Sequence, residues 1–401
     1  MPRVETPVNP KILVWARETL GYDLETVAQK LKDKKENIEA WRERLKAWEE
    51  GTDNPTFSQL EHLAGIYQQP LIVFFHDQPP KEPELPTDYR RFPSGSPKPL
   101  DPQTKTSIWK AQWRQSVAES LRKEMGVEII FQPWSEIAEE DAEELAFEAR
   151  NYLRPQIEVK REWAKDSDQL FKRWRAILEK IGILVFRFNF PRDDARAFSL
   201  SGELAPIITV SSKDFYNAQI FSLFHELAHL LLSQSGTCND LEFRTEPTTE
   251  LDRVEIFCNH FAGAFLVPRN ALLDHPMIKN KYYRALDDSN IHDLAKYFGV
   301  SHEVVLRRLV FLTRLDADFY KQWRKQQENY WKEAGQPKGN FGVEHSYVRK
   351  ILSSQGQAYI ETVLSAYSEN LVNLSEVSEY LSVKVKHVSE IQEFLYEGGI
   401  D

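Results

Sequence analysis

Apolar residues recur along two segments of the chain with the 3.6-residue period of an α-helix. In Phe221–Leu232 they cover nearly every side of the helical projection, which is typical of a helix buried in a core. A second apolar segment, Arg253–Val267, follows the polar stretch Ser233–Glu250 and stops before Pro268, a residue that cannot continue a helix. The pattern therefore predicts two buried helices joined by a loop.

Three short apolar runs precede the first buried helix and predict a small β-sheet. They are separated by the turn-forming stretches 191–194 and 202–206 and comprise Ile183–Phe188, Ala197–Ser201 and Ile207–Val210. The second run is a candidate sheet edge, at which Phe198–Ser201 would hydrogen-bond an extended peptide. The alternative is that the strands only cover the helix, and the pattern fits both readings.

Shorter amphipathic helices are predicted on both sides of this central region. The N-terminal group covers about residues 7–76 and closes with the apolar segment Pro70–Phe75. Proline-punctuated sequence at 76–104 then predicts an extended linker, which would let the first domain move. The remaining predicted helices are Ile108–Met125, Glu136–Leu153, Asp168–Ile181, Phe319–Trp331, Tyr347–Tyr367 and Leu374–Tyr396, with a glycine-rich turn at Gly335–Gly342.

These patterns predict four regions along the chain. They are an N-terminal all-α domain at 1–77, a proline-rich linker with a connecting helix at 78–135, a mixed α+β domain at 136–315 and a helical C-terminal domain at 316–401. The C-terminal helices have apolar faces to bury but offer no catalytic cluster, which favours a separate interaction or sensing module.

Composition narrows the class of protein without naming an activity. A chain of 401 residues with 41% hydrophobic residues is long enough to bury two or three cores. Two cysteines, no apolar N-terminal segment and no run of 18 apolar residues predict a soluble protein of the reducing cytosol, without a membrane role. The net charge of −10 argues against a general coat for nucleic acid. The oligomeric state stays open.

Candidate chemistry lies inside the first buried helix, in the sequence His225-Glu226-Leu227-Ala228-His229. Histidines four residues apart share one helical face and can reach a single zinc ion, with Glu226 beside it as a general acid and base for amide hydrolysis. The alternative is a helix whose histidines are exposed or hydrogen-bonded in the core. The apolar flanks argue against this alternative, because buried polar groups need partners.

A catalytic zinc has three protein ligands, so a third ligand is expected on another element. Glu255, on the second buried helix, is the favoured candidate. Asn259 lies four residues later on the same face and would orient the Glu255 carboxylate or contact substrate. His260 and Cys258 compete as ligands, but His260 is about 140° around the helix from Glu255, and Cys258 is more typical of a small core residue.

The central region resembles the ImmA/IrrE metallopeptidases over roughly residues 136–315. The matching segments are Gly182–Phe186, Arg196–Ser199, Pro206–Val210, Phe221–Leu230 and Glu255 with Cys258–Ala262. The resemblance implies a zincin-like fold, His225, His229 and Glu255 as Zn²⁺ ligands, and Glu226 as the catalytic residue. It also implies cleavage of a DNA-binding repressor or a similar regulatory protein. Cys258 and Gly263 stand where the family usually has alanine.

The N-terminal helices resemble a Cro/repressor-type (XRE) helix-turn-helix domain, which implies DNA binding. The local charge disagrees, because residues 1–70 hold ten Lys and Arg against twelve Asp and Glu, whereas a DNA reader needs a basic face. Glu36, Glu39 and Glu43 lie on the expected recognition helix. A docking or dimerisation module is the alternative. A second helix-turn-helix cadence at Ile291–Leu309 resembles a segment that follows the zinc helices in the ImmA/IrrE family, which implies a structural role in closing the peptidase core. DNA contacts through Arg307 and Arg308 are the alternative.

The favoured hypothesis is a cytoplasmic zinc endopeptidase that cleaves a regulatory partner in a stress, phage-defence, toxin–antitoxin or mobile-element circuit. Tyr216 or His260 would be the nearest candidates to stabilise an oxyanion. The rival hypothesis is a transcriptional regulator or antitoxin that binds its partner stoichiometrically, with a structural or silent zinc site. A third combines the two, with DNA binding delivering the protease to a bound repressor.

Overall fold

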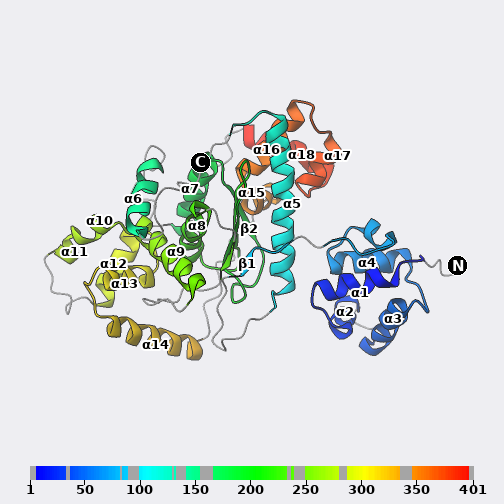
Figure 1. Cartoon of the computed structure of the whole chain (residues 1–401), viewed down its shortest axis with the longest axis horizontal. Coiled ribbons are helices and arrows are strands. Elements are labelled where there is room, and N and C mark those ends of the chain that lie inside the picture. Colours follow the sequence, from blue (N-terminus) through cyan, green and yellow to red (C-terminus); the bar gives the residue numbers. More distant parts are fainter. Residues whose placement is uncertain are drawn as a thin grey trace. The chain divides into compact units, whose positions relative to one another are not determined.

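The computed structural model describes residues 6–32, 37–81, 84–88, 99–128, 131, 141–153, 166–232, 236–238, 249–279, 287–334 and 346–396. The chain divides into two compact units (Figure 1). The first comprises residues 1–85 and 97–109, and the second comprises residues 86–96 and 110–401. The start of the predicted helix at 136, most of the loop 233–250 and the glycine-rich turn lie outside the described residues.

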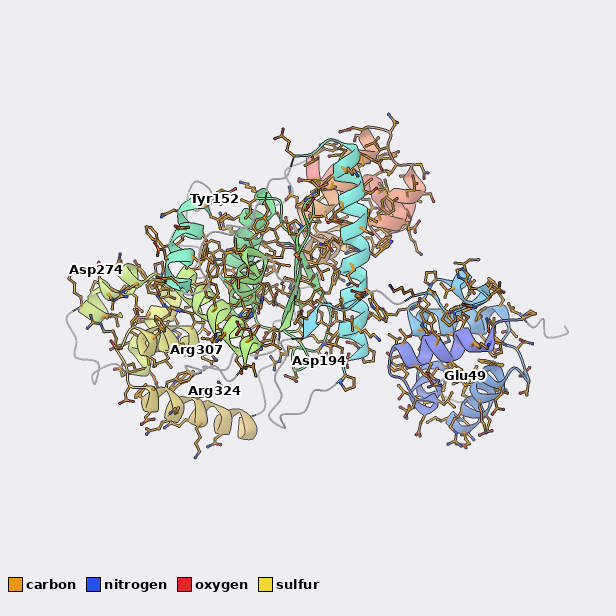
Figure 2. The ribbon with its side chains drawn as sticks, viewed as in Figure 1. Glu49, Tyr152, Asp194, Asp274, Arg307 and Arg324 are labelled. Atoms are coloured by element: carbon orange, nitrogen blue, oxygen red, sulfur yellow. The ribbon has the colours of Figure 1, made fainter. Side chains whose placement is uncertain are left out.

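The first unit is a bundle of short helices. Its helices are α1 (Pro10–Thr19), α2 (Leu24–Leu31), α3 (Ile38–Glu50) and α4 (Phe57–Tyr67), followed by a 3-10 turn at Leu71–Phe75. Each begins at a side chain that accepts a backbone hydrogen bond, such as Asp23 before α2 and Thr56 before α4, so the start positions are encoded locally. Arg17 joins α1 to α3 through two hydrogen bonds to Glu49 (Figure 2).

The second unit is built around a five-stranded mixed sheet with the order β1-β5-β3-β4-β2. Its strands are β1 (Thr87–Asp88), β2 (Leu184–Phe188), β3 (Ala197–Leu200), β4 (Ile207–Ser211) and β5 (Gly236–Cys238). The three predicted strands are therefore present, within one residue of their expected ends. Strands β1 and β5 were not predicted, and β1 lies within the segment expected to be an extended linker.

The register of β3 contradicts the prediction of a free edge at Phe198–Ser201. Strand β3 is antiparallel to β4 on one side and to β5 on the other, so Phe198 lies opposite both Thr209 and Thr237. Its backbone is therefore paired on both sides from Ala197 to Ser199. An extended peptide cannot add to an internal strand, because the hydrogen-bonding groups are already used.

Helices cover both faces of the sheet. One face carries α7 (Ser167–Lys180) and α8 (Tyr216–Leu231), and α9 (Glu250–Leu266) packs on α8, with α6 (Ala142–Leu153) packed on α9. The part of α5 (Pro102–Glu124) from Lys110 onward lies on the opposite side of the sheet (Figure 1). There the Arg114 side chain lies over the rings of Phe186 and Phe188 on β2. Alternate strand residues consequently face two separate cores.

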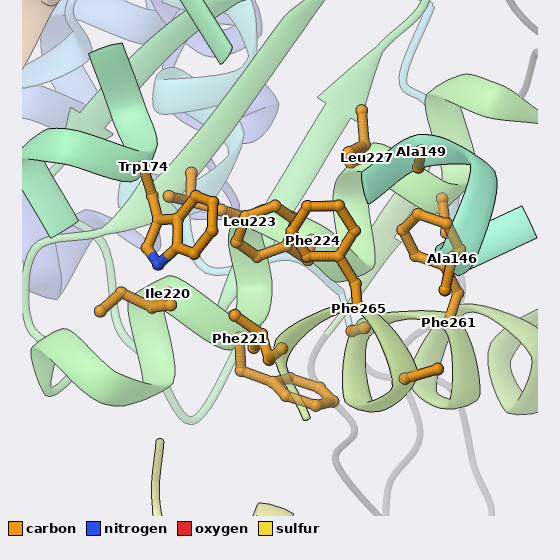
Figure 3. Close-up of a cluster of buried hydrophobic side chains, with 14 of the residues drawn as sticks. Ala146, Ala149, Trp174, Ile220, Phe221, Leu223, Phe224, Leu227, Phe261 and Phe265 are labelled. Carbon is orange, nitrogen blue, oxygen red and sulfur yellow. The ribbon is translucent and has the colours of Figure 1, made fainter. Parts of the chain in front are cut away.

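Aromatic side chains fill the core between α7, α8 and α9. Phe224 stacks on Phe265 with ring centroids 4.1 Å apart, and Trp174 meets Phe224 edge-on at 4.9 Å (Figure 3). All three side chains are buried. Because α8 and α9 are held together by these rings, the polar residues on their shared face have fixed positions.

The helices after α9 are α10 (Arg269–Leu273), α11 (Pro276–Lys279), α12 (Asp288–Phe298), α13 (His302–Phe311) and α14 (Ala317–Ala334). The last part of the chain contains α15 (Tyr347–Gln355), α16 (Gln357–Ser368), α17 (Leu374–Tyr380), a 3-10 turn at Val385–His387 and α18 (Val388–Tyr396). The helix predicted over 347–367 is thus broken at Gly356, whose φ of 79° and ψ of 155° end α15. The one predicted over 374–396 is interrupted after Tyr380.

The C-terminal helices pack on the sheet of the second unit. Arg175 of α7 donates to the carbonyl of Val185 on β2 and to the carbonyls of Leu352 and Ser353 on α15. The same guanidinium forms a buried ion pair with Glu179 at 3.1 Å. Residues 346–396 therefore complete this side of the fold instead of forming a compact unit of their own.

The possible DNA contacts of Arg307 and Arg308 are contradicted by the structure, because both guanidinium groups are paired within the protein. Arg307 (Figure 2) donates to Glu303 at 2.7 Å and to Tyr320 at 3.1 Å. Arg308 is buried and donates two hydrogen bonds to Glu143, at 2.9 and 2.8 Å. Neither side chain is available to replace a phosphate counterion.

Among the described helices, none has the combination of length and apolar character that crossing a bilayer requires.

Candidate functional site

Helix α8 carries two histidines in its C-terminal half, both almost completely buried. His225 and His229 are one turn apart, and their Nε2 atoms lie 3.3 Å from each other. The helix packs on α9 and on strands β3 and β4, because its apolar residues point to both layers. The polar face that contains the histidines is consequently fixed between the sheet and α9.

Glu255 of α9 faces the two imidazoles. Its Oε1 lies 3.1 Å from His229 Nε2, and its Oε2 lies 3.5 Å from His225 Nε2. One ligand atom from each of the three residues falls within 4.8 Å of the others, and in the described residues this is the single such group of histidine, cysteine or carboxylate side chains. The structure thus brings together the three residues that sequence spacing and the family resemblance selected.

Asn259 orients His225. Its Oδ1 lies 3.1 Å from His225 Nδ1, so an Nδ1 proton is donated to the amide oxygen and the Nε2 lone pair is left facing His229 and Glu255. This is the usual way in which a second group fixes the tautomer of a metal-binding histidine. Asn259 is expected from the sequence to orient the Glu255 carboxylate, but in the structure it contacts the His225 imidazole instead.

Glu226 is completely buried beside this group. Burial raises the pKa of its carboxyl group, while His229, His225 and the hydroxyl of Ser199 on β3 act in the opposite direction. Within the described part of the chain, neither Glu226 oxygen has a hydrogen-bond partner of regular geometry. A buried carboxylate with a raised pKa and unused oxygens is suited to accept and return a proton.

The three converging side chains form an electrostatically coupled group. Burial opposes a charged imidazole, yet the carboxylate of Glu255 outweighs it and raises the pKa of His225. Burial likewise opposes ionisation of Glu255, but the two imidazoles lower the pKa of its carboxyl group. Two imidazoles and one ionised carboxylate are the donor set that a catalytic zinc site uses. The residues therefore fit Zn²⁺.

The competing candidates lie away from this group. His260 Nε2 is 3.0 Å from Glu143 of α6, and Cys258 is fully buried in the hydrophobic core, as its residue type predicts. Tyr216 packs against Phe171 at a ring distance of 5.9 Å, and burial raises the pKa of its phenol. It sits in the first turn of α8, nine residues before His225. Neither His260 nor Tyr216 is placed to stabilise an oxyanion here.

Two residues that contribute to this region are not identified by sequence patterns. Ser199 lies in an apolar strand that the sequence predicts as a sheet edge. Glu143 lies in a predicted amphipathic helix, and in the structure it joins α6 to His260 and Arg308. Both act across long separations in the chain, so no local spacing could have identified them.

The site defines a metallopeptidase-like centre in a mixed α+β domain. Residues 178–310 match the family model described as Peptidase_M78, the IrrE N-terminal-like domain. The matched segment runs from the end of α7 to the last residues of α13 and contains His225, Glu226, His229 and Glu255. No curated protein matches this chain. The family match supports a peptidase with a metal, typically zinc, for this segment.

Proposed function

We propose that this protein is a zinc-dependent endopeptidase that cleaves a regulatory protein. The observation that carries the proposal is the convergence of His225, His229 and Glu255 beside the buried carboxylate of Glu226. The match of residues 178–310 to a peptidase family supports the same reaction class. A structural zinc site does not need a further carboxylate next to it, whereas peptide hydrolysis needs a proton acceptor there.

Each residue has a distinct role in the proposed reaction. His225, His229 and Glu255 would hold Zn²⁺, which when bound polarises a scissile carbonyl and acidifies a water molecule. Asn259 keeps His225 in the tautomer that presents Nε2. Glu226 accepts a proton from the attacking water and returns it to the leaving amine, and its raised pKa makes its carboxylate a stronger base for this exchange.

We infer a regulatory protein as substrate, for example a DNA-binding repressor or the product of a neighbouring gene. The inference rests on the ImmA/IrrE resemblance. It is also compatible with the paired backbone of β3. Because that strand is internal, an extended substrate segment would have to bind elsewhere than at Phe198.

Purified, zinc-loaded protein incubated with each candidate neighbour protein tests the proposal. Wild type should cleave one of them, while Glu226→Gln should bind metal and remain folded without cleaving. Glu250→Gln is the matched control, since Glu250 starts α9 but its side chain is 69% exposed. Regulation that survives intact in Glu226→Gln would support the rival role as a stoichiometric binder, with a silent metal site.

For the N-terminal unit we propose a helix-turn-helix fold that docks protein in preference to DNA. On α3, the candidate recognition helix, the guanidinium of Arg42 lies 2.5 Å from Glu39 and 3.6 Å from Glu43. The exposed carboxylates of Glu39 and Glu43 would repel phosphate, so this part of α3 is poorly suited to DNA contacts. Gel-shift measurements across salt concentrations test this, because a DNA-binding unit would lose affinity steeply as salt rises.

A further inference from the structure

Two histidines outside the candidate zinc site lie in contact on the surface of the second unit. His292 is on α12 and His302 is the first residue of α13. Gly299 ends α12 in the left-handed conformation, and the Ser301 side chain caps α13. This tight connection places His292 Nδ1 3.2 Å from His302 Nε2. The pair is therefore a consequence of the local turn.

The pair lines an open pocket of about 470 Å³. Ser167, Asn217 and Lys296 also contribute to its wall. Both histidine side chains are exposed at its mouth. Burial and the neighbouring His292 lower the pKa of His302, which favours the neutral form of this ring. Neutral imidazole is the form that binds metal.

The distance between the two nitrogens matches a metal-binding pair. With Zn–N bonds of about 2.0–2.1 Å and tetrahedral angles, two ligand nitrogens lie roughly 3.3–3.4 Å apart. The pair His225 and His229, in the candidate catalytic site, has a separation of 3.3 Å. The separation of 3.2 Å between His292 Nδ1 and His302 Nε2 is close to the distance expected around zinc and to the separation of His225 and His229.

We propose that His292 and His302 form a second binding site for a divalent transition-metal ion such as Zn²⁺. Water completes the coordination from the open pocket, and Asp288, one turn before His292, supplies a nearby negative charge. The site binds more weakly than the buried triangle, because it has two protein ligands and no coordinating carboxylate. Lys296, which is exposed on the same wall, also weakens it.

Occupation of this site would brace the α12–α13 connection. An ion held by both histidines links two helices that meet at the Gly299 turn. Helix α13 also carries Arg308, which donates to the carbonyl of Val267 at the end of α9 and to Glu143 of α6. Metal binding here should consequently raise the thermal stability of the second unit, independently of catalysis.

Calorimetric titration of the untagged, metal-free protein with ZnCl₂ tests the proposal. Wild type should show a tight and a weaker binding event. His292→Ala with His302→Ala should remove the weaker event or lower its affinity at least tenfold, while His62→Ala, an exposed histidine of α4, leaves both unchanged. The proposal is overturned if the weaker event is unaltered in the double variant or if wild type shows no weaker event. In either case the two histidines form only a hydrogen-bonded pair.

The second site can be examined apart from the proposed peptidase. In His229→Ala the tight event should disappear, while Zn²⁺ should still raise the melting temperature through the weaker site. Adding His292→Ala and His302→Ala to this variant should abolish the rise. If wild type shows no tight binding event, the result counts against the proposed function. If zinc does not raise the melting temperature of His229→Ala, the result counts against the second site.

Discussion

Replacement of Gly356 by alanine should strongly destabilise the second unit. Gly356 has φ 79° and ψ 155°, a region that is nearly exclusive to glycine and costs other residues about 1–3 kcal/mol. A Cβ atom there would also overlap Glu179 Oε1 and would lie 2.7 Å from Arg175 Nη2 and 2.8 Å from the carbonyl oxygen of Val185. The substitution therefore strains the backbone and displaces a buried ion pair at the same time.

The larger contribution comes from the ion pair. Arg175 and Glu179 are each about 8% exposed and lie 3.1 Å apart. Separating the partners of a buried pair typically costs about 3–5 kcal/mol. With the backbone strain, Gly356→Ala should lower the free energy of unfolding by roughly 4–8 kcal/mol, which is comparable to the whole stability of many domains.

Gly126→Ala separates the two contributions. Gly126 also has a positive φ, of 67°, but a Cβ atom built on it meets nothing within 4 Å. Its replacement should cost about 1–2 kcal/mol from conformation alone. Urea unfolding followed by tryptophan fluorescence and circular dichroism measures both variants. If Gly356→Ala is no less stable than Gly126→Ala, or if it loses only residues 346–396 while the sheet stays intact, the C-terminal helices do not complete the fold as described.

Three further predictions concern the described side chains. His260 and Arg308 overcome the effect of burial and lower the pKa of Glu143 to about 2. The ion pairs of Glu143 therefore stabilise the fold fully above about pH 4.5, and this stabilisation is lost as the pH falls toward 2. In Glu143→Gln the urea midpoint should depend less on pH over this range, and an unchanged dependence would count against the role of these ion pairs. Asn259→Ala should weaken zinc binding about 10–100-fold, measured in competition with a chromophoric chelator, because His225 loses its orienting partner. Equal zinc affinities of wild type and variant would show that Asn259 does not orient His225. Ser199→Ala should raise the pKa of Glu226 further and shift the acidic limb of the kcat/KM profile to higher pH, whereas a superimposable profile would show that the hydroxyl has no influence.

The parts of the fold that sequence predicted are those with a strong local pattern. The apolar period of α8 and α9 and the four-residue spacing of His225 and His229 depend on neighbouring residues, so they are visible in the chain. Strand β1 has two residues and β5 has three, and both lie within polar stretches of the sequence. Strands of this length are too short to give a periodic signal. The internal position of β3 depends on β5 and was missed for the same reason.

Long-range contacts explain the remaining differences. The break at Gly356 was overlooked because a single glycine in an apolar helical pattern is compatible with a continuous helix; only the approach to Val185 and Glu179 requires it. Arg307 and Arg308 had the charge of a DNA-binding surface, but Glu303 and Glu143 neutralise them in the fold. The partner of a charged side chain decides its role, and that partner is set by tertiary structure.

The most direct test of the central claim is anomalous diffraction at the zinc absorption edge from crystals of zinc-loaded Glu226→Gln. The account predicts a strong peak bonded to His225 Nε2, His229 Nε2 and a carboxylate oxygen of Glu255, at about 2.0–2.2 Å from each. A saturated crystal without a peak between these three residues, or with zinc there but Glu255 turned away from it, would contradict the assignment of this site as a catalytic metal centre.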